Sequence, residues 1–211
     1  MRFEPILIVA GEPNSIFLEI FLKSIKNNKI RSPIIFIASL KLVKLQMSKL
    51  KIKKKINIII NKNLKLNKIT KNKINLINVN YNPKKPFEKI SKKSNSYIRA
   101  SFNIAIKLIK KGYADKLING PISKKSFLDK RYLGMTEYLA EKFSIKESAM
   151  LIYNKKLSVC PITTHLPLKL VGKKINKKII YNKIKLINYF YKKNFLFKPK
   201  IAVLGLNPHC E

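Results

Sequence analysis

The chain contains two histidines, His165 and His209, and both follow short apolar runs that are typical of β-strands. Residues 159–162 (Val-Cys-Pro-Ile) precede His165, and residues 201–204 (Ile-Ala-Val-Leu) precede His209. Ligand sites of parallel α/β folds lie beyond the carboxyl ends of strands, and imidazole is a common ligand of divalent metals. The pair therefore predicts a metal or ligand site. A catalytic metal site typically uses three protein ligands, so we expect the third ligand from sequence outside this chain or from another subunit. The alternative for either histidine alone is a purely structural role.

Two further motifs combine a glycine with an expected helix start. In residues 119–124 (Asn-Gly-Pro-Ile-Ser-Lys), Ser123 or Lys124 would begin a helix, whose free amides favour anions. In residues 134–140 (Gly-Met-Thr-Glu-Tyr-Leu-Ala), Thr136 lies at or near a helix N-terminus, where it either contacts a phosphate or carboxylate or serves as an ordinary cap. A plain turn is the alternative for the first motif. Neither a Gly-x-Gly-x-x-Gly nor a Walker-type loop occurs, so a Rossmann-type cofactor site has no support.

The hydrophobic period alternates between that of strands and that of helices, which predicts an α/β fold. The segment at residues 61–93 is polar and rich in Asn and Lys, and we expect it to be irregular around one short strand. The expected strands are residues 5–10, 33–38, 56–60, 74–79, 114–118, 149–153, 157–162 and 200–206, and the expected helices are residues 15–27, 39–50 (capped by Ser39), 94–111, 136–143 and 175–194.

The composition combines a globular hydrophobic content of 46% with a formal net charge of +36 over 211 residues. Such a charge attracts polyanions, so a basic nucleic-acid-binding protein is the non-enzyme alternative. The lysines, however, are spread along nearly the whole chain, and only Arg2, Arg31, Arg99 and Arg131 supply the bidentate guanidinium that base and phosphate recognition favours. We therefore favour an ordinary enzyme with a Lys-, Asn- and Ile-rich composition, and expect no specific nucleic-acid partner.

The location is expected to be the cytoplasm. The longest apolar stretches, such as residues 33–38, are far too short to span a bilayer, and we find no signal peptide, so no membrane partner is expected. Cys160 and Cys210 have no disulfide-framework spacing, which suits a reducing compartment.

Taken together, the motifs resemble a known family. Residues 119–124, 134–140, 163–168 (Thr-Thr-His-Leu-Pro-Leu) and 205–209 (Gly-Leu-Asn-Pro-His), in this order, resemble the 4-hydroxythreonine-4-phosphate dehydrogenases of pyridoxal 5′-phosphate (PLP) biosynthesis. A weaker match is the Gly-Glu-Pro at residues 11–13, and the resemblance runs from about residue 6 to the end.

The resemblance implies an α/β/α sandwich similar to the isocitrate and isopropylmalate dehydrogenases, with two subdomains flanking a cleft, and a homodimer. We expect the subdomains at residues 1–120 and 121–211, the second incomplete and carrying the metal histidines. The implied reaction is the oxidation of 4-phosphohydroxy-L-threonine by NAD or NADP with a divalent metal (Zn, Mg or Co). Its β-keto acid product loses CO2 to give 3-amino-2-oxopropyl phosphate.

The resemblance also assigns residues. His165 and His209 match two of three metal histidines, and the third lies in family sequence beyond Glu211, so we expect a C-terminally truncated copy. Met135 and Thr136 fall on the family's substrate-binding His-Thr pair. Because Met135 replaces a histidine, a paralogous dehydrogenase of threonate or erythronate 4-phosphate stays open as an alternative. Because the expected copy is truncated, an inactive fragment is a further alternative. No residue is identified as the general base.

Overall fold

The chain forms two compact units, Met1–Arg131 and Tyr132–Glu211. A computed structural model describes residues 4–27, 30–60, 64, 68–70, 73–123, 127–128, 131–132 and 134–205. Gly120 and Pro121 belong to the first unit, where the backbone N–H of Glu12 donates to the carbonyl of Pro121 at 2.8 Å. A subdomain boundary after residue 120 stays a prediction.

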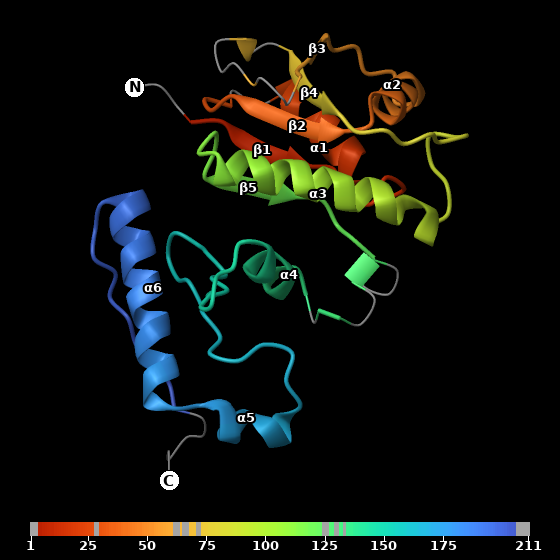
Figure 1. The fold of residues 1–211 in the computed structure, drawn as a ribbon. Helices are drawn as coiled ribbons and strands as arrows, with labels where there is room; N and C mark the ends of the chain where they lie inside the picture. The colour runs from red at the N-terminus through yellow and green to blue at the C-terminus, as the bar shows by residue number, and fades with distance from the viewer. Residues whose placement is uncertain are drawn as a thin grey trace. The chain divides into compact units, whose positions relative to one another are not determined.

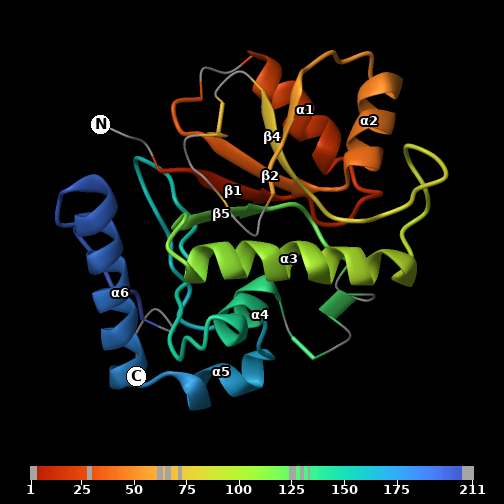
Figure 2. The ribbon, with the colours of Figure 1, turned by 45° about the horizontal axis from the view of Figure 1, so that its top comes forward.

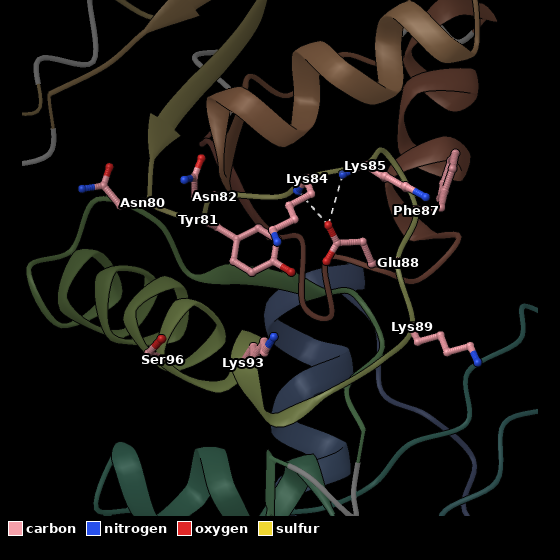
Figure 3. Close-up of a pocket in the computed structure, with 10 residues that line it drawn as sticks. All are labelled: Asn80, Tyr81, Asn82, Lys84, Lys85, Phe87, Glu88, Lys89, Lys93 and Ser96. Carbon is pink, nitrogen blue, oxygen red and sulfur yellow. Dashed lines mark hydrogen bonds between the residues drawn. The ribbon is translucent and has the colours of Figure 1, made fainter.

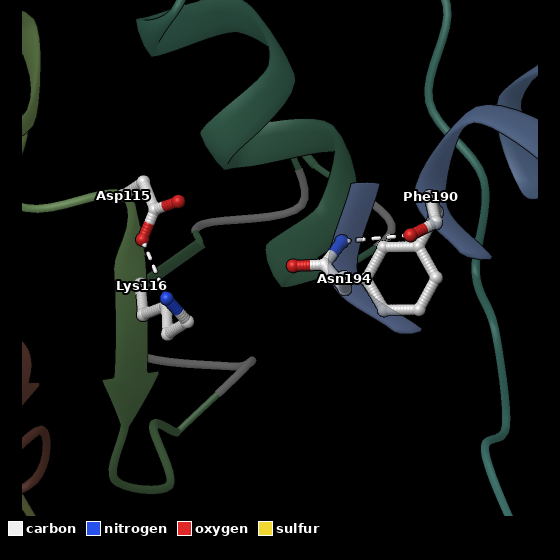
Figure 4. Close-up of polar contacts among 4 residues, drawn as sticks. All are labelled: Asp115, Lys116, Phe190 and Asn194. Carbon is white, nitrogen blue, oxygen red and sulfur yellow. Dashed lines mark hydrogen bonds and ion pairs between the residues drawn. The ribbon is translucent and has the colours of Figure 1, made fainter. Parts of the chain in front are cut away.

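The first unit is built on a parallel sheet, which confirms the α/β fold class (Figure 1). Its five strands have the order β3-β4-β2-β1-β5, so β3 and β5 lie at the edges. Their bounds are Ile6–Val9 (β1), Ile34–Ala38 (β2), Ile56–Ile58 (β3), Ile74–Asn78 (β4) and Lys116–Asn119 (β5). At the start of β5, Lys116 Nζ lies 3.0 Å from Asp115 Oδ1, an exposed ion pair that adds little stability (Figure 4).

Helices cover both faces of this sheet, which gives the first unit three layers (Figures 1 and 2). Helices α1 (Phe17–Asn27) and α2 (Leu40–Lys49) lie on one face, and α3 (Asn95–Lys110) lies on the other after a short 3-10 turn at Lys92–Ser94. Strands buried on both faces read as continuous apolar runs, and residues 34–38 (Ile-Ile-Phe-Ile-Ala) are such a run. Phe36 stacks on Phe21 of α1 with ring centroids 4.1 Å apart. As predicted, Ser39 caps α2, accepting from the Leu42 amide.

One buried amide, Asn75 in β4, connects three parallel segments, and the sequence pattern did not predict it. Its side chain is 2% exposed. The Nδ2 group donates to the carbonyls of Ile34 at 3.0 Å and Thr70 at 2.8 Å. The Oδ1 atom accepts from Asn57 Nδ2 and from the Thr70 amide, both at 2.9 Å. The carboxamide of Asn75 therefore uses both of its donor hydrogens and its acceptor oxygen within the first unit, partly to Thr70 in the segment before β4.

At the carboxyl edge of the sheet, the loops after β1 and β5 approach each other through glycines. Gly11 has a φ of +72°, and a Cβ there would lie 2.5 Å from the carbonyl oxygen of Pro121. A Cβ on Gly120 would overlap the carbonyl oxygen of Ala10. No side chain larger than hydrogen fits at either position, so the two loops are held backbone against backbone.

The second unit contains α4 (Met135–Lys142), α5 (Leu168–Lys174) and α6 (Lys177–Phe195). The ring of Tyr191 in α6 is buried and lies 5.3 Å from Phe195 between ring centroids. Tyr153 stacks on Phe195 at 5.1 Å. Near the end of α6, Asn194 Nδ2 donates to the Phe190 carbonyl at 2.8 Å (Figure 4). Of the helices described in either unit, none is both long and apolar enough to cross a membrane.

Three secondary-structure predictions for the second unit are wrong. The expected strands at residues 149–153 and 157–162 form only a single antiparallel bridge, between Ile152 and Val159. Residues 200–205 are not in a strand, and Val203 and Leu204 are 55% and 87% exposed. An apolar run forms a strand when a neighbouring strand pairs with its backbone, and within the described part of the chain none does so here. Helix α5, absent from the prediction, follows Pro167, so His165 lies between a bridge and a helix rather than directly after a strand.

We predict that Gly120→Ala destabilises the first unit by about 3 kcal/mol or more, because the added methyl overlaps the backbone of the neighbouring loop. Gly112→Ala is a matched control: Gly112 has a φ of +74° but nothing within 4 Å of its Cβ position. It should lose about 1–2 kcal/mol through backbone strain alone. Urea denaturation of both variants measures the difference, and equal losses would contradict the close approach of the loops.

We also predict that Asn75→Ala lowers the free energy of unfolding by about 2–3 kcal/mol, because the half-buried carbonyls of Ile34 and Thr70 lose their donor. The control is Asn57→Ala, because the Asn57 carboxamide donates to Asn75 Oδ1 and to the exposed backbone carbonyl of Lys68. Since Asn75 keeps its other partners in that variant, the expected loss is below about 1 kcal/mol. Thermal unfolding would contradict this account if the control lost as much.

Candidate functional site

Helix α4 begins with the predicted substrate residues. Met135 and Thr136 are its first two residues, and both are half-buried. The N-cap residue is Gly134, with an extended backbone and no side-chain capping bond. The amides of the first turn therefore have no side-chain cap and present partial positive charge, which suits an anion such as a phosphate or carboxylate.

The loop that carries His165 lies against this helix start. His165 adopts a left-handed backbone with a φ of +56°, and its side chain is exposed. Its Nε2 atom lies 3.7 Å from the point where a Cβ of Gly134 would stand. The fold thus places the predicted metal ligand beside the predicted substrate segment, although the two are far apart in sequence.

Glu137, in the first turn of α4, also lies beside Gly134. Its Oε2 atom lies 3.1 Å from the same Cβ position of Gly134. The oxygen is buried, and among the described residues it has no hydrogen-bond partner. Burying a carboxylate oxygen without a hydrogen-bond donor costs free energy, and a donor or a cation beside this atom would offset that cost.

An imidazole nitrogen and a carboxylate oxygen therefore flank a space that exists because Gly134 has no side chain. Imidazole nitrogen is a donor that holds divalent metals, so His165 fits as one ligand of the metal that the sequence predicts. His209 and the rest of residues 206–211 lie outside the described residues. Within the described part, no group of three or more His, Cys, Asp or Glu side chains could hold a metal ion. A site formed by His165 and His209 stays a prediction.

In the first unit, the loops at the carboxyl edge hold a buried acid that the sequence pattern did not single out. Glu12 is 2% exposed. Its Oε2 accepts from Ser94 Oγ at 2.9 Å, and its Oε1 accepts from the Asn14 amide at 3.3 Å. The Gly-Glu-Pro motif at residues 11–13 was a signal for Glu12, whereas nothing in the sequence marked Ser94 as its partner.

The Asn-Gly-Pro motif lies at the end of β5, next to the loop of Glu12. Asn119 Nδ2 donates to the carbonyl of Gly120 at 3.1 Å. The carbonyl of Ser123 accepts from the Phe127 amide at 2.8 Å. Lys124 lies outside the described residues, so the anion-binding role suggested for this turn stays a prediction.

A pocket of about 700 Å³ lies in the segment that was expected to be irregular (Figure 3). The Oε1 atom of Glu88 accepts from the amides of Lys84 at 2.7 Å and Lys85 at 3.1 Å, and these bonds lower the pKa of Glu88. Burial raises the pKa of Tyr81, whose hydroxyl accepts from Asn14. The lining residues are Asn80, Tyr81, Asn82, Lys84, Lys85, Phe87, Glu88, Lys89, Lys93 and Ser96. The lysines outnumber the single acid, so the pocket is cationic, but it contains none of the predicted site residues.

Comparison with known proteins places the chain among relatives of one kind. The family model described as pyridoxal phosphate biosynthetic protein PdxA matches residues 29–211. The 4-hydroxythreonine-4-phosphate dehydrogenase of Sulfurihydrogenibium sp. (strain YO3AOP1) is 39% identical over 210 residues, which cover 97% of this chain and 63% of that protein. The chain thus spans less than two thirds of that relative's length.

Solved structures show the same fold. A putative 4-hydroxythreonine-4-phosphate dehydrogenase from Salmonella typhimurium superposes with a TM-score of 0.82 at 23% identity, over 99% of this chain and 65% of that one. The enzyme of the same name from Burkholderia phymatum gives 0.81 at 22% identity, over 99% and 64%. At this identity the likeness establishes the fold alone, while the family match covers most of the sequence. The chain belongs to the family of the pyridoxal phosphate biosynthetic protein PdxA.

Proposed function

We propose that the protein oxidises 4-phosphohydroxy-L-threonine with NAD or NADP and a divalent metal. The β-keto acid product would then decarboxylate to 3-amino-2-oxopropyl phosphate, a step toward PLP in the cytoplasm. The observation that carries this proposal is the position of His165 beside the start of α4, in a chain whose 39%-identical relative is named for this activity. The expected homodimer, the metal and the nucleotide are parts of the same proposal.

In this proposal His165 and His209 would hold the cation through their imidazole rings, and a third histidine would come from family sequence that this chain does not contain. A divalent cation lowers the pKa of a hydroxyl group that it binds and polarises a neighbouring carbonyl. Zn, Mg and Co are the candidate ions, and a site built on imidazole favours Zn or Co over Mg. NAD or NADP, when bound, would supply the redox chemistry as the hydride acceptor.

The start of α4 would bind the substrate. The uncapped amides and the hydroxyl of Thr136 can donate to an anionic group of the substrate, and the helix dipole favours its negative charge. Met135 stands where the family has a histidine, and its thioether is only a weak acceptor. This departure favours the second candidate function, oxidation of another phosphorylated hydroxy acid such as threonate or erythronate 4-phosphate.

We predict that His165→Ala in the full-length protein lowers NADH or NADPH formation at least about 100-fold, because the cation loses one of its protein ligands. Lys169→Ala is the control, since this exposed lysine lies in the same segment at the start of α5. The rate is followed at 340 nm with Zn²⁺, Mg²⁺ or Co²⁺ added. Undiminished turnover of the His165 variant would remove the metal role.

We predict that Met135→His raises the affinity for 4-phosphohydroxy-L-threonine by about tenfold, the effect of one added hydrogen bond to a charged group. The measurement is KM and kcat on a panel that also contains threonate 4-phosphate and erythronate 4-phosphate. Met135→Leu is the control, because it keeps the apolar volume and adds no donor. If the unaltered protein prefers one of the two hydroxy acids without an amino group, the paralogue function replaces the proposed one.

A further inference from the structure

The two carboxylates on α4 have different environments. Glu141 is exposed, and its Oε1 accepts from the Tyr132 hydroxyl at 2.6 Å. Glu137, one turn earlier, has a buried Oε2 without a partner among the described residues. The first carboxylate is satisfied by its own surroundings, while the second keeps an unused acceptor at the helix start.

A ring nitrogen of His165 lies close to the same helix start. Nε2 of His165 and Oε2 of Glu137 lie 3.7 Å and 3.1 Å from the single point where a Gly134 Cβ would stand. Gly134 itself is buried, while His165 is exposed, so the two groups approach Gly134 from the surface and from the helix. The exposed His165 side chain has room to turn, whereas Glu137 is fixed in the first turn of a helix.

We propose that the Glu137 carboxylate positions the His165 imidazole by accepting a hydrogen bond from its Nε2–H. The other ring nitrogen, Nδ1, then lacks a proton and faces the cation. Metal-bound histidines commonly donate their second N–H to a carboxylate, which fixes the tautomer and the ring orientation. The inference rests on the proposed function for the role of the cation, but the hydrogen bond itself involves only this chain.

Gly134 has a defined part in this arrangement. Any side chain at this position would place its Cβ within van der Waals distance of both polar atoms. An apolar methyl there would separate the imidazole from the carboxylate and remove the space that they share. The glycine thus keeps the path between Glu137 and His165 open.

The first test measures the affinity of the 211-residue chain for Zn²⁺ by competition with a chromophoric chelator. Glu137→Ala should weaken binding by about ten- to hundredfold, the usual effect of losing a carboxylate behind a metal-bound histidine. Glu137→Gln should lose less, because its carboxamide oxygen still accepts a hydrogen bond. Glu141→Ala, on the same helix, should leave the affinity unchanged.

A double variant distinguishes positioning from direct ligation. If Glu137 acts through His165, then Glu137→Ala should cause no further loss in a His165→Ala background. An equal loss in both backgrounds would identify Glu137 as a ligand in its own right and overturn the proposal. No loss in the unaltered background would overturn it as well.

A second readout does not depend on metal binding. A hydrogen-bonded imidazole N–H exchanges slowly enough to give a downfield proton resonance in the NMR spectrum. We expect such a signal in the unaltered chain and in Glu141→Ala, and its loss in Glu137→Ala and His165→Ala. If the chain binds no Zn²⁺ but this signal behaves as expected, the metal role fails and the hydrogen bond stands. If the signal is absent from the unaltered chain or survives in Glu137→Ala, the positioning role fails.

Discussion

The arrangement of the loops at the carboxyl ends of the strands depends on one contact, in which the backbones of the loops after β1 and β5 touch. Gly11 and Gly120 permit that contact, and the amide of Glu12 donates across it to the Pro121 carbonyl. The same contact fixes where the Glu12 side chain points, and hence its bond to Ser94 at the start of α3. It also fixes Asn14, which binds the wall of the cationic pocket through Tyr81 and the Glu88 amide. An apolar core stabilises the layers, but this contact aligns the loops.

The sequence alone was sufficient to predict those strands and helices whose burial produces a regular hydrophobic pattern along the chain. The apolar runs of β1, β2 and β4 and the helical spacing of α3 were predicted within one or two residues of their observed ends. The runs at residues 157–162 and 200–205 have the same character, yet they form a single bridge and no strand. The difference lies in long-range pairing, which no local pattern encodes. Helix α5 was missed because its short, lysine-rich segment has no buried residue and hence no apolar periodicity.

The candidate site was predicted in its residue types but not in its contacts. His165 was identified because imidazole is scarce in this chain, and Thr136 because it follows a glycine before a helical pattern. That these segments meet at Gly134 depends on the path of the chain between them, which contains neither a long helix nor a paired strand. The buried oxygen of Glu137, which has no partner among the described residues, became visible only in three dimensions. The pocket at residues 80–96 was hidden for another reason: lysines are so frequent that four more carry no signal.

Asn75 has a consequence for how the edge of the sheet is assembled. Strand β3 has three residues, too few for apolar burial to define its alignment with β4. The paired carboxamides of Asn57 and Asn75 stand opposite each other in the ladder, and Asn75 is bound at the same time to the carbonyls of Ile34 and Thr70. If β3 slipped by one position, Asn57 would turn to the opposite face and leave Asn75 with one acceptor bond fewer. A strand of only three half-exposed residues thereby acquires a single register, which is set by hydrogen bonds between polar side chains rather than by apolar burial.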